Sequence, residues 1–112
     1  MNFGDIVYVD LGTPIGSEAG FVRPVIIVTA DAFMRYRPTT VFAVPLTTTQ
    51  RTFPSHIPLE PDHLNGLLTR SYALVEQLRA IAIERCGKTL GNVGPLATHQ
   101  ILDTLAMITG MP

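Results

Sequence analysis

The feature that most constrains the fold is a series of short, β-branched runs, each of which ends at glycine or proline within a few residues. Residues 6–9, 24–29 and 40–44 are rich in Val, Ile and Thr, as is typical of buried strands. Residues 55–59 alternate polar and apolar side chains, and their proline suits an edge strand. Nine glycines and nine prolines are spread between such runs instead of forming a linker. The pattern predicts a small, mainly β (β+α) domain.

Helical signals lie mostly in the second half of the chain. We expect a helix that opens within residues 88–95, has Pro95 in its first turn and ends at Gly110. Three apolar residues on one face would pack it on the sheet: Ile101, Leu105 and Ile108. By the spacing of its apolar residues alone, segment 71–83 also predicts a helix. A short turn over residues 32–34 is expected to be capped by Asp31, and Pro45 to mark the exit of the third strand.

Composition indicates one folded unit. A chain of 112 residues, 46% hydrophobic and only 15% charged, predicts a single domain over residues 1–112 with apolar surface left for a partner, so we expect a dimer. The N-terminus has no basic stretch and no long apolar run follows, so neither a signal peptide nor a membrane span is expected, and the location expected is the cytoplasm. The single Cys86 and the scattered His56, His63 and His99 show no metal-ligand spacing, so no metal site is expected.

The net charge of −1 argues against a strongly basic nucleic-acid binder, but the charges are unevenly placed. Residues 1–18 carry three acids, and residues 60–112 carry four bases against five acids. The middle segment, 19–59, carries four arginines against one aspartate. Arginine binds phosphate with two parallel hydrogen bonds, so a positive groove is one interpretation and a scatter of solvated charges is the other.

Four residues have side chains suited to phosphodiester chemistry, and each also has a simpler structural reading. Arg23, held extended by the following proline, can neutralise a phosphate, or it can be a solvated strand residue paired with Glu18. Thr47 can donate to a phosphate oxygen, or serve only as a strand and turn residue. Glu18 can accept the proton of a ribose 2′-hydroxyl, or merely hold the arginine. His56 can act as an acid or base, although a lone edge-strand histidine is more often at the surface.

Missing motifs narrow the chemistry. The sequence has no P-loop, no carboxylate cluster for two metals and no Cys/His signature. RNA permits a reaction without metal, because its own 2′-hydroxyl attacks the adjacent phosphorus and the protein need only position it, neutralise charge and move protons.

Several ordered motifs resemble the MazF/PemK family of toxin endoribonucleases between Gly4 and about Gly110. They are GDIVYVDL at 4–11, GSE at 16–18, RPV at 23–25, VPLTTTQ at 44–50 and LVEQLRAI at 74–81. The resemblance implies an SH3-like small barrel of the MazF/CcdB type with a C-terminal helix, with segment 71–83 as a strand instead of a helix. It also implies a homodimer that cuts single-stranded RNA (mRNA) without a cofactor, leaving a 2′,3′-cyclic phosphate and a 5′-hydroxyl, and a cognate antitoxin with a disordered acidic tail.

Residue by residue, the resemblance implies catalytic roles for Arg23, Thr47 and Glu18. We expect five further residues to bind substrate: Ser17, Thr48, Gln50, Glu76 and Gln77. This chain departs from the family after Glu18, where Phe21 can stack on a base or anchor the loop to the core, and we expect anchoring.

Two other functions remain open at this point. A CcdB-like poison of DNA gyrase would share the barrel and bind a protein without cutting RNA, and an SH3-like adaptor would not inhibit growth at all. The Arg23 and Thr47 pair separates the hypotheses, because it is useful for cutting RNA and unnecessary for binding gyrase.

Overall fold

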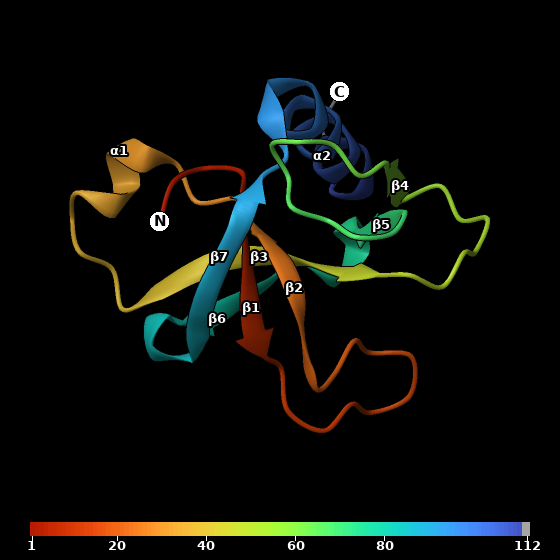
Figure 1. The fold of residues 1–112 in the computed structure, drawn as a ribbon. Helices are drawn as coiled ribbons and strands as arrows, with labels where there is room; N and C mark the ends of the chain where they lie inside the picture. The colour runs from red at the N-terminus through yellow and green to blue at the C-terminus, as the bar shows by residue number, and fades with distance from the viewer. Residues whose placement is uncertain (111–112) are drawn as a thin grey trace.

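The structure is a computed structural model that describes residues 1–110, so the last two residues of the predicted domain range 1–112 lie outside it. Figure 1 shows the order of its elements along the chain. The strands are β1 (Asp5–Asp10), β2 (Val22–Ile27), β3 (Thr40–Thr47), β4 (His56–Leu59), β5 (Ser71–Leu74), β6 (Arg79–Ala82) and β7 (Cys86–Asn92). The helices are α1 (Asp31–Met34) and α2 (Gly94–Ile108), with two 3₁₀ turns, η1 (Val75–Gln77) and η2 (Ile83–Arg85).

The strands form one antiparallel sheet in the order β4-β5-β3-β2-β1-β7, with β6 also paired to β3. The prediction of a mainly β domain with a C-terminal helix is confirmed. Within residues 1–110 the end strands β4 and β7 do not pair with each other, so the curled sheet is not closed into a continuous barrel. No helix in this part of the chain is long and apolar enough to span a membrane.

Both faces of the central strands are buried, which explains their nearly continuous apolar sequences. Ile6, Ile26 and Val44 belong to the core on one face, where α2 inserts Ile101. Their chain neighbours, such as Val25, belong to a second core on the opposite face. Figure 1 shows α2 at the end of the sheet where β4 and β5 lie. The expected packing of the last helix on the sheet is confirmed for Ile101 and Leu105, whereas Ile108, expected on the same face, is exposed.

The last helix begins near the end of the range 88–95 in which its opening is expected, because residues 86–92 form strand β7 alongside β1. The helix begins only at Gly94, which has a φ of +83° and donates its N–H to Asn92 Oδ1 at 2.8 Å. Pro95 does stand in the first turn, and Gly110, with a φ of +76°, follows the end.

Segment 71–83 is not the helix that its apolar spacing predicts. It is strand at both ends, as the family resemblance implies, and is interrupted by the single 3₁₀ turn η1. Ala43 pairs with Arg79 on β6 and Leu46 pairs with Ala73 on β5. Three residues along β3 therefore span six residues of the antiparallel segment. The three additional residues are the length of η1. Pairing with β3 therefore overrides the helical propensity of Ala, Leu, Glu and Gln, and η1 projects from the sheet.

The same interruption explains why Pro45 does not end β3, as its sequence predicts, but lies inside it. Phe42 makes backbone bonds on the β2 side, through its N–H to Thr29 Oγ1 and its C=O to Val28. Because backbone groups alternate along a strand, the nitrogen of Pro45 faces the other side. There the partner chain has left the sheet as η1, so the missing N–H of proline costs no ladder bond.

Two local predictions are wrong. Asp31 does not cap α1, whose N-cap residue is Ala30; instead its Oδ1 accepts the N–H of Phe3 at 2.8 Å. Phe21 does not anchor its side chain in the core, because that side chain is 63% exposed. It is the backbone of Phe21, at a φ of +60°, that fastens the long β1–β2 loop, through bonds with Gly12 and Leu11.

Candidate functional site

The register of β2 and β3 sets Arg23 across from Thr47. Val25 pairs with Pro45 and Ile27 with Ala43, and the same register extended by two residues matches Arg23 with Thr47. Residues directly opposite in antiparallel strands point to the same face. The two side chains consequently line one pocket, although they are far apart in sequence.

Arg23 is fixed by two backbone carbonyls. Its Nε donates to the carbonyl of Gly20 at 2.9 Å and its Nη1 donates to the carbonyl of Leu46 at 3.3 Å. A guanidinium has five N–H donors, so the remaining donors are available to a ligand. No ion pair with Glu18 is found among residues 1–110, so the simple reading of Arg23 as the partner of that glutamate is not what the structure shows.

Thr47 is oriented by the turn that follows it. Its Oγ1 accepts the N–H of Thr49 at 3.1 Å, which leaves the hydroxyl proton free to be donated. Side chains after Thr47 do not all reach this pocket. Thr49 and Arg51 line it. Of the two expected substrate-binding residues in this segment, Thr48 lines a second hollow with residues of β1 and β7, and Gln50 lines neither hollow.

The loop between β1 and β2 forms another wall of the pocket. The side-chain amide of Gln77 on η1 binds the backbone of this loop at two points. Its Oε1 accepts the N–H of Ala19 at 2.6 Å, and its Nε2 donates to the carbonyl of Ser17 at 3.0 Å. Glu18 lies between these two contacts. Its Oε1 accepts the N–H of Ile15 at 3.0 Å, which stabilises the loop locally.

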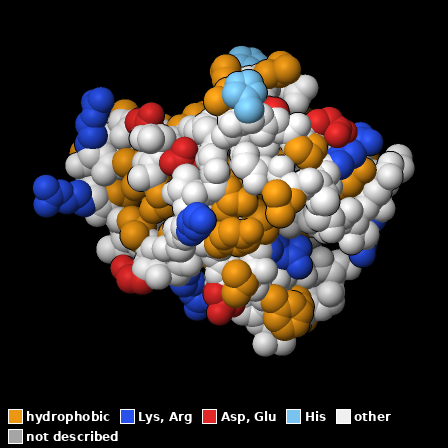
Figure 2. All heavy atoms as spheres, in the orientation of Figure 1, with side chains coloured by type: hydrophobic (Ala, Val, Ile, Leu, Met, Phe, Trp, Pro, Cys, Tyr) orange, Lys and Arg blue, Asp and Glu red, His pale blue; other side chains and the backbone are white. Residues whose placement is uncertain are grey.

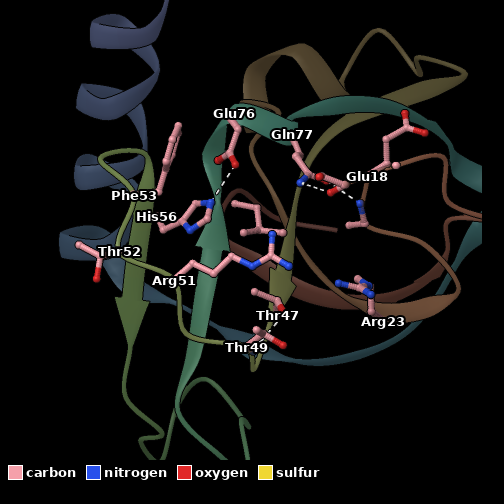
Figure 3. Close-up of a pocket in the computed structure, with 14 residues that line it drawn as sticks. Glu18, Arg23, Thr47, Thr49, Arg51, Thr52, Phe53, His56, Glu76 and Gln77 are labelled. Atoms are coloured by element: carbon pink, nitrogen blue, oxygen red, sulfur yellow. Dashed lines mark hydrogen bonds and ion pairs between the residues drawn. The ribbon is translucent and has the colours of Figure 1, made fainter.

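A network of side chains forms the wall opposite the loop (Figure 3). His56 Nε2 lies 2.8 Å from Glu76 Oε2, and Ser55 Oγ donates to Glu76 Oε1 at 2.7 Å. Burial opposes ionisation of Glu76, but the hydrogen bonds with Ser55 and His56 outweigh it and hold the pKa of its carboxyl below the ordinary value. The His56 side chain is only 8% exposed, so the expectation of a surface histidine is wrong. Phe53 lies against its ring, with 5.4 Å between centroids.

Together these walls enclose an open pocket of about 660 Å³, within the range of small-ligand sites. Figure 3 shows Arg51 reaching across it toward Thr47. Its lining residues include Ser17, Glu18, Arg23, Thr47, Thr49, Arg51, Phe53, His56, Glu76 and Gln77. The arrangement offers two guanidinium groups, a hydroxyl donor, two carboxylates and an imidazole, which suits binding of a phosphodiester and proton transfer around it.

Groups outside this pocket offer little competing chemistry. Residues 1–110 contain no set of three or more His, Cys, Asp or Glu side chains arranged to hold a metal. Burial, and secondarily the charge of Glu84, raises the pKa of the Cys86 thiol, which therefore remains protonated at neutral pH.

Sequence reasoning identified six of these lining residues as site residues and missed others, notably Thr49, Arg51 and Phe53. Two of these carried a usable signal. Thr49 and Arg51 stand two and four residues after Thr47, so a strand period of two continued past the strand end predicts all three on one side. For Phe53 no local signal exists.

Comparisons with known proteins agree with this geometry. The family model described as the PemK-like, MazF-like toxin of type II toxin–antitoxin systems matches residues 2–109. The chain is 34% identical over 83 residues to endoribonuclease EndoA of Bacillus subtilis, covering 73% of this chain and 71% of the relative. It is 32% identical over 112 residues to endoribonuclease MazF of Staphylococcus saprophyticus, covering 99% and 92% of the two chains.

Solved structures give the same result. A mycobacterial endoribonuclease in complex with its cognate antitoxin superposes with a TM-score of 0.80 at 28% identity, over 100% of this chain and 97% of that one. MazF from Deinococcus radiodurans shares the fold, with a TM-score of 0.83 at 21% identity over 99% and 97% of the two chains. These matches favour the RNA-cutting toxin over the gyrase poison. With its fold and residues 2–109 matched, the chain belongs to the PemK-like, MazF-like toxins of type II toxin–antitoxin systems.

Proposed function

We propose that this single-domain toxin is an endoribonuclease that cuts single-stranded RNA at a short sequence without a metal ion. The observation that carries the proposal is the placement of Arg23 directly across from Thr47 in one accessible pocket. The activity of the EndoA and MazF relatives, named as endoribonucleases, supports it. Side chains of the pocket can fill every charge and proton role that the attack of a 2′-hydroxyl needs.

In the proposed reaction Arg23 and Thr47 bind the non-bridging oxygens of the scissile phosphate. Arg23 supplies the N–H donors that its two carbonyl contacts leave free, and Thr47 supplies its hydroxyl proton. Glu18 accepts the proton of the ribose 2′-hydroxyl as the 2′-oxygen bonds to phosphorus. The bond from phosphorus to the 5′-oxygen then breaks and the 5′-oxygen takes up a proton, giving a 2′,3′-cyclic phosphate and a 5′-hydroxyl. Fixed donors aimed at developing negative charge are the main source of rate enhancement in such a site.

The remaining expected contacts divide by position. Ser17, Glu76 and Gln77 line the pocket, which supports the proposal that they contact the nucleotides beside the scissile bond. Thr48 and Gln50 lie outside it, so any contact they make is with RNA that continues along the surface.

A homodimer and an antitoxin are the proposed protein partners, in the cytoplasm. Figure 2 shows hydrophobic side chains gathered across the middle of one face. Large apolar residues are also exposed in and near the β1–β2 loop and beside β1 and β7, including Ile15, Phe21, Val22 and Leu68. Such a surface is typical of an interface. The mycobacterial structure shows that relative with its cognate antitoxin, and a disordered acidic tail would be attracted by Arg23 and Arg51.

The test is to incubate the purified protein with a long single-stranded RNA in excess chelator and to map the fragment ends. Cuts at one repeated short sequence, each ending in a 2′,3′-cyclic phosphate, are expected. Intact RNA under these conditions, or cutting that appears only when a divalent ion is added back, would contradict the proposal. Loss of gyrase activity with RNA left intact would instead favour the gyrase poison.

A further inference from the structure

The pocket holds an imidazole, that of His56, to which the reaction above gives no part. It comes from β4, whereas Thr47 is on β3 and Arg23 on β2, and β3 lies between the other two strands in the sheet. Figure 3 shows His56 on one side of the pocket and the β1–β2 loop that carries Glu18 on the other, with the Glu18 carboxylate turned toward its own loop. A phosphate bound at Thr47 would therefore have His56 on one side, and on the other side it would have the loop, from which Glu18 must turn inward to act.

Hydrogen bonds fix the ring of His56, as is typical of histidines that transfer protons. Nε2 is bound to Glu76 at 2.8 Å, and Glu76 is itself fixed by the hydroxyl of Ser55 at 2.7 Å. The hydrogen bonds with Ser55 and His56 hold the pKa of Glu76 below its ordinary value, so its carboxylate is charged at neutral pH and can accept a hydrogen bond from His56 Nε2. The other charged side chains that line the pocket are Glu18, Arg23 and Arg51.

The second ring nitrogen is unsatisfied. His56 Nδ1 is buried and has no hydrogen-bond partner among residues 1–110. A buried polar atom without a partner is costly in a folded protein, and a catalytic role is one explanation for such an atom. The ring lines the pocket, so a small movement of the ring would bring Nδ1 to a ligand bound there.

On the basis of the proposed RNA cleavage, we propose that His56 is the general acid that protonates the 5′-oxygen leaving group, with Glu76 as its positioning residue. In-line displacement puts the attacking and leaving oxygens on opposite sides of phosphorus, and His56 lies across the pocket from the loop that carries Glu18.

The protons balance in this scheme. The 2′-hydroxyl proton moves to Glu18 as the 2′-oxygen to phosphorus bond forms. The proton of His56 Nδ1 moves to the 5′-oxygen as its bond to phosphorus breaks. Glu18 and His56 then return to their starting states by exchange with water.

The experiment compares two RNA substrates that differ in one atom at the cleavage site, the normal 5′-bridging oxygen and a 5′-bridging sulfur. A thiolate leaves without protonation, so a general acid matters only for the oxygen. We expect His56→Gln to slow cleavage of the oxygen substrate by about 100-fold or more, the contribution of a general acid, and to cut the sulfur substrate nearly as fast as the unmodified protein. Glu76→Gln should show the same selective rescue with a smaller loss. Arg23→Ala should be slow on both substrates.

His99→Gln, an exposed histidine on α2, is the matched control and should leave both rates unchanged. Circular dichroism and thermal unfolding check that each variant folds. Equal losses on both substrates, or full activity of His56→Gln on the oxygen substrate, would overturn the role of His56 while leaving the nuclease proposal intact. If the unmodified protein cuts neither RNA, the nuclease proposal itself fails.

Discussion

The two sides of the pocket are built in different ways. On the side of Arg23 and Thr47, the backbone ladder of β2 and β3 places the residues, and carbonyls fix the guanidinium. On the side of His56 and Glu76, side chains separated by 20 residues in sequence hold each other. The first arrangement persists when its side chains are replaced, because the ladder remains. The second depends on every member, so replacing one member should disturb the others.

The largest effect is expected at Arg23. Arg23→Ala removes the charge proposed to meet the phosphate, and loss of one such donor group typically costs about 100- to 1,000-fold in rate. The fold should be retained, because the backbone ladder does not need the side chain. Initial rates on an RNA with a single cleavage site measure the effect, with Arg35→Ala, an exposed arginine beside α1, as control. Unfolding of Arg23→Ala would show that this side depends on its side chains after all.

Thr47→Val should have the next largest effect. The change keeps the shape and removes one hydroxyl donor, for which we expect a loss of roughly 10- to 100-fold in kcat with little change in KM. Thr40→Val, an exposed threonine at the other end of β3, is the matched control. An equal loss in both variants would assign the effect to the strand and not to the hydroxyl.

Gln77→Ala tests the loop beside Arg23, which is held by side-chain bonds and not by the ladder. It removes both bonds to the β1–β2 loop, each worth about 1 kcal/mol. Hydrogen exchange of the Ala19 amide should become faster by about tenfold, and RNA cutting should weaken because Glu18 loses its fixed position. Amides within β2 and β3 should exchange as before. Faster exchange throughout the sheet would mean that the loop and the ladder are not independent.

The smallest effect concerns acid stability. The folded pKa of Glu76 lies below its ordinary value, so its interactions stabilise the protein above the ordinary carboxyl range and are lost as the pH falls through the lowered pKa. Urea unfolding followed from neutral pH to about pH 3 should therefore show a decline in stability that is less steep in Glu76→Gln. Glu60→Gln, an exposed glutamate paired with Arg70, provides the comparison. Identical slopes for the unmodified protein and Glu76→Gln would contradict the network.

The same division explains what the sequence could predict. The strands around Val25 and Val44 are evident from their β-branched runs, and the β2–β3 register then brings Arg23 to Thr47 with no further information. His56 is recognisable in the sequence as a candidate acid or base, but its burial is not. The burial depends on Glu76 and Phe53, which meet His56 only after β4, β5 and η1 have formed.

The errors over residues 71–83 and Pro45 have one source. Helical propensity and proline placement are local rules, and both were overridden by the pairing of β3 with two strands whose registers differ by three residues. A register change of this kind leaves no periodic signal in either strand.

The turn η1 leaves the sheet and returns to it with both flanking strands paired to β3. Side chains at 76 and 77 can therefore be exchanged without altering any strand pairing, whereas deletion of one residue would shift a whole strand by one position and turn its interior outward. Substitution within this short insert is thus a route by which toxins built on one scaffold could diverge in the messages they destroy.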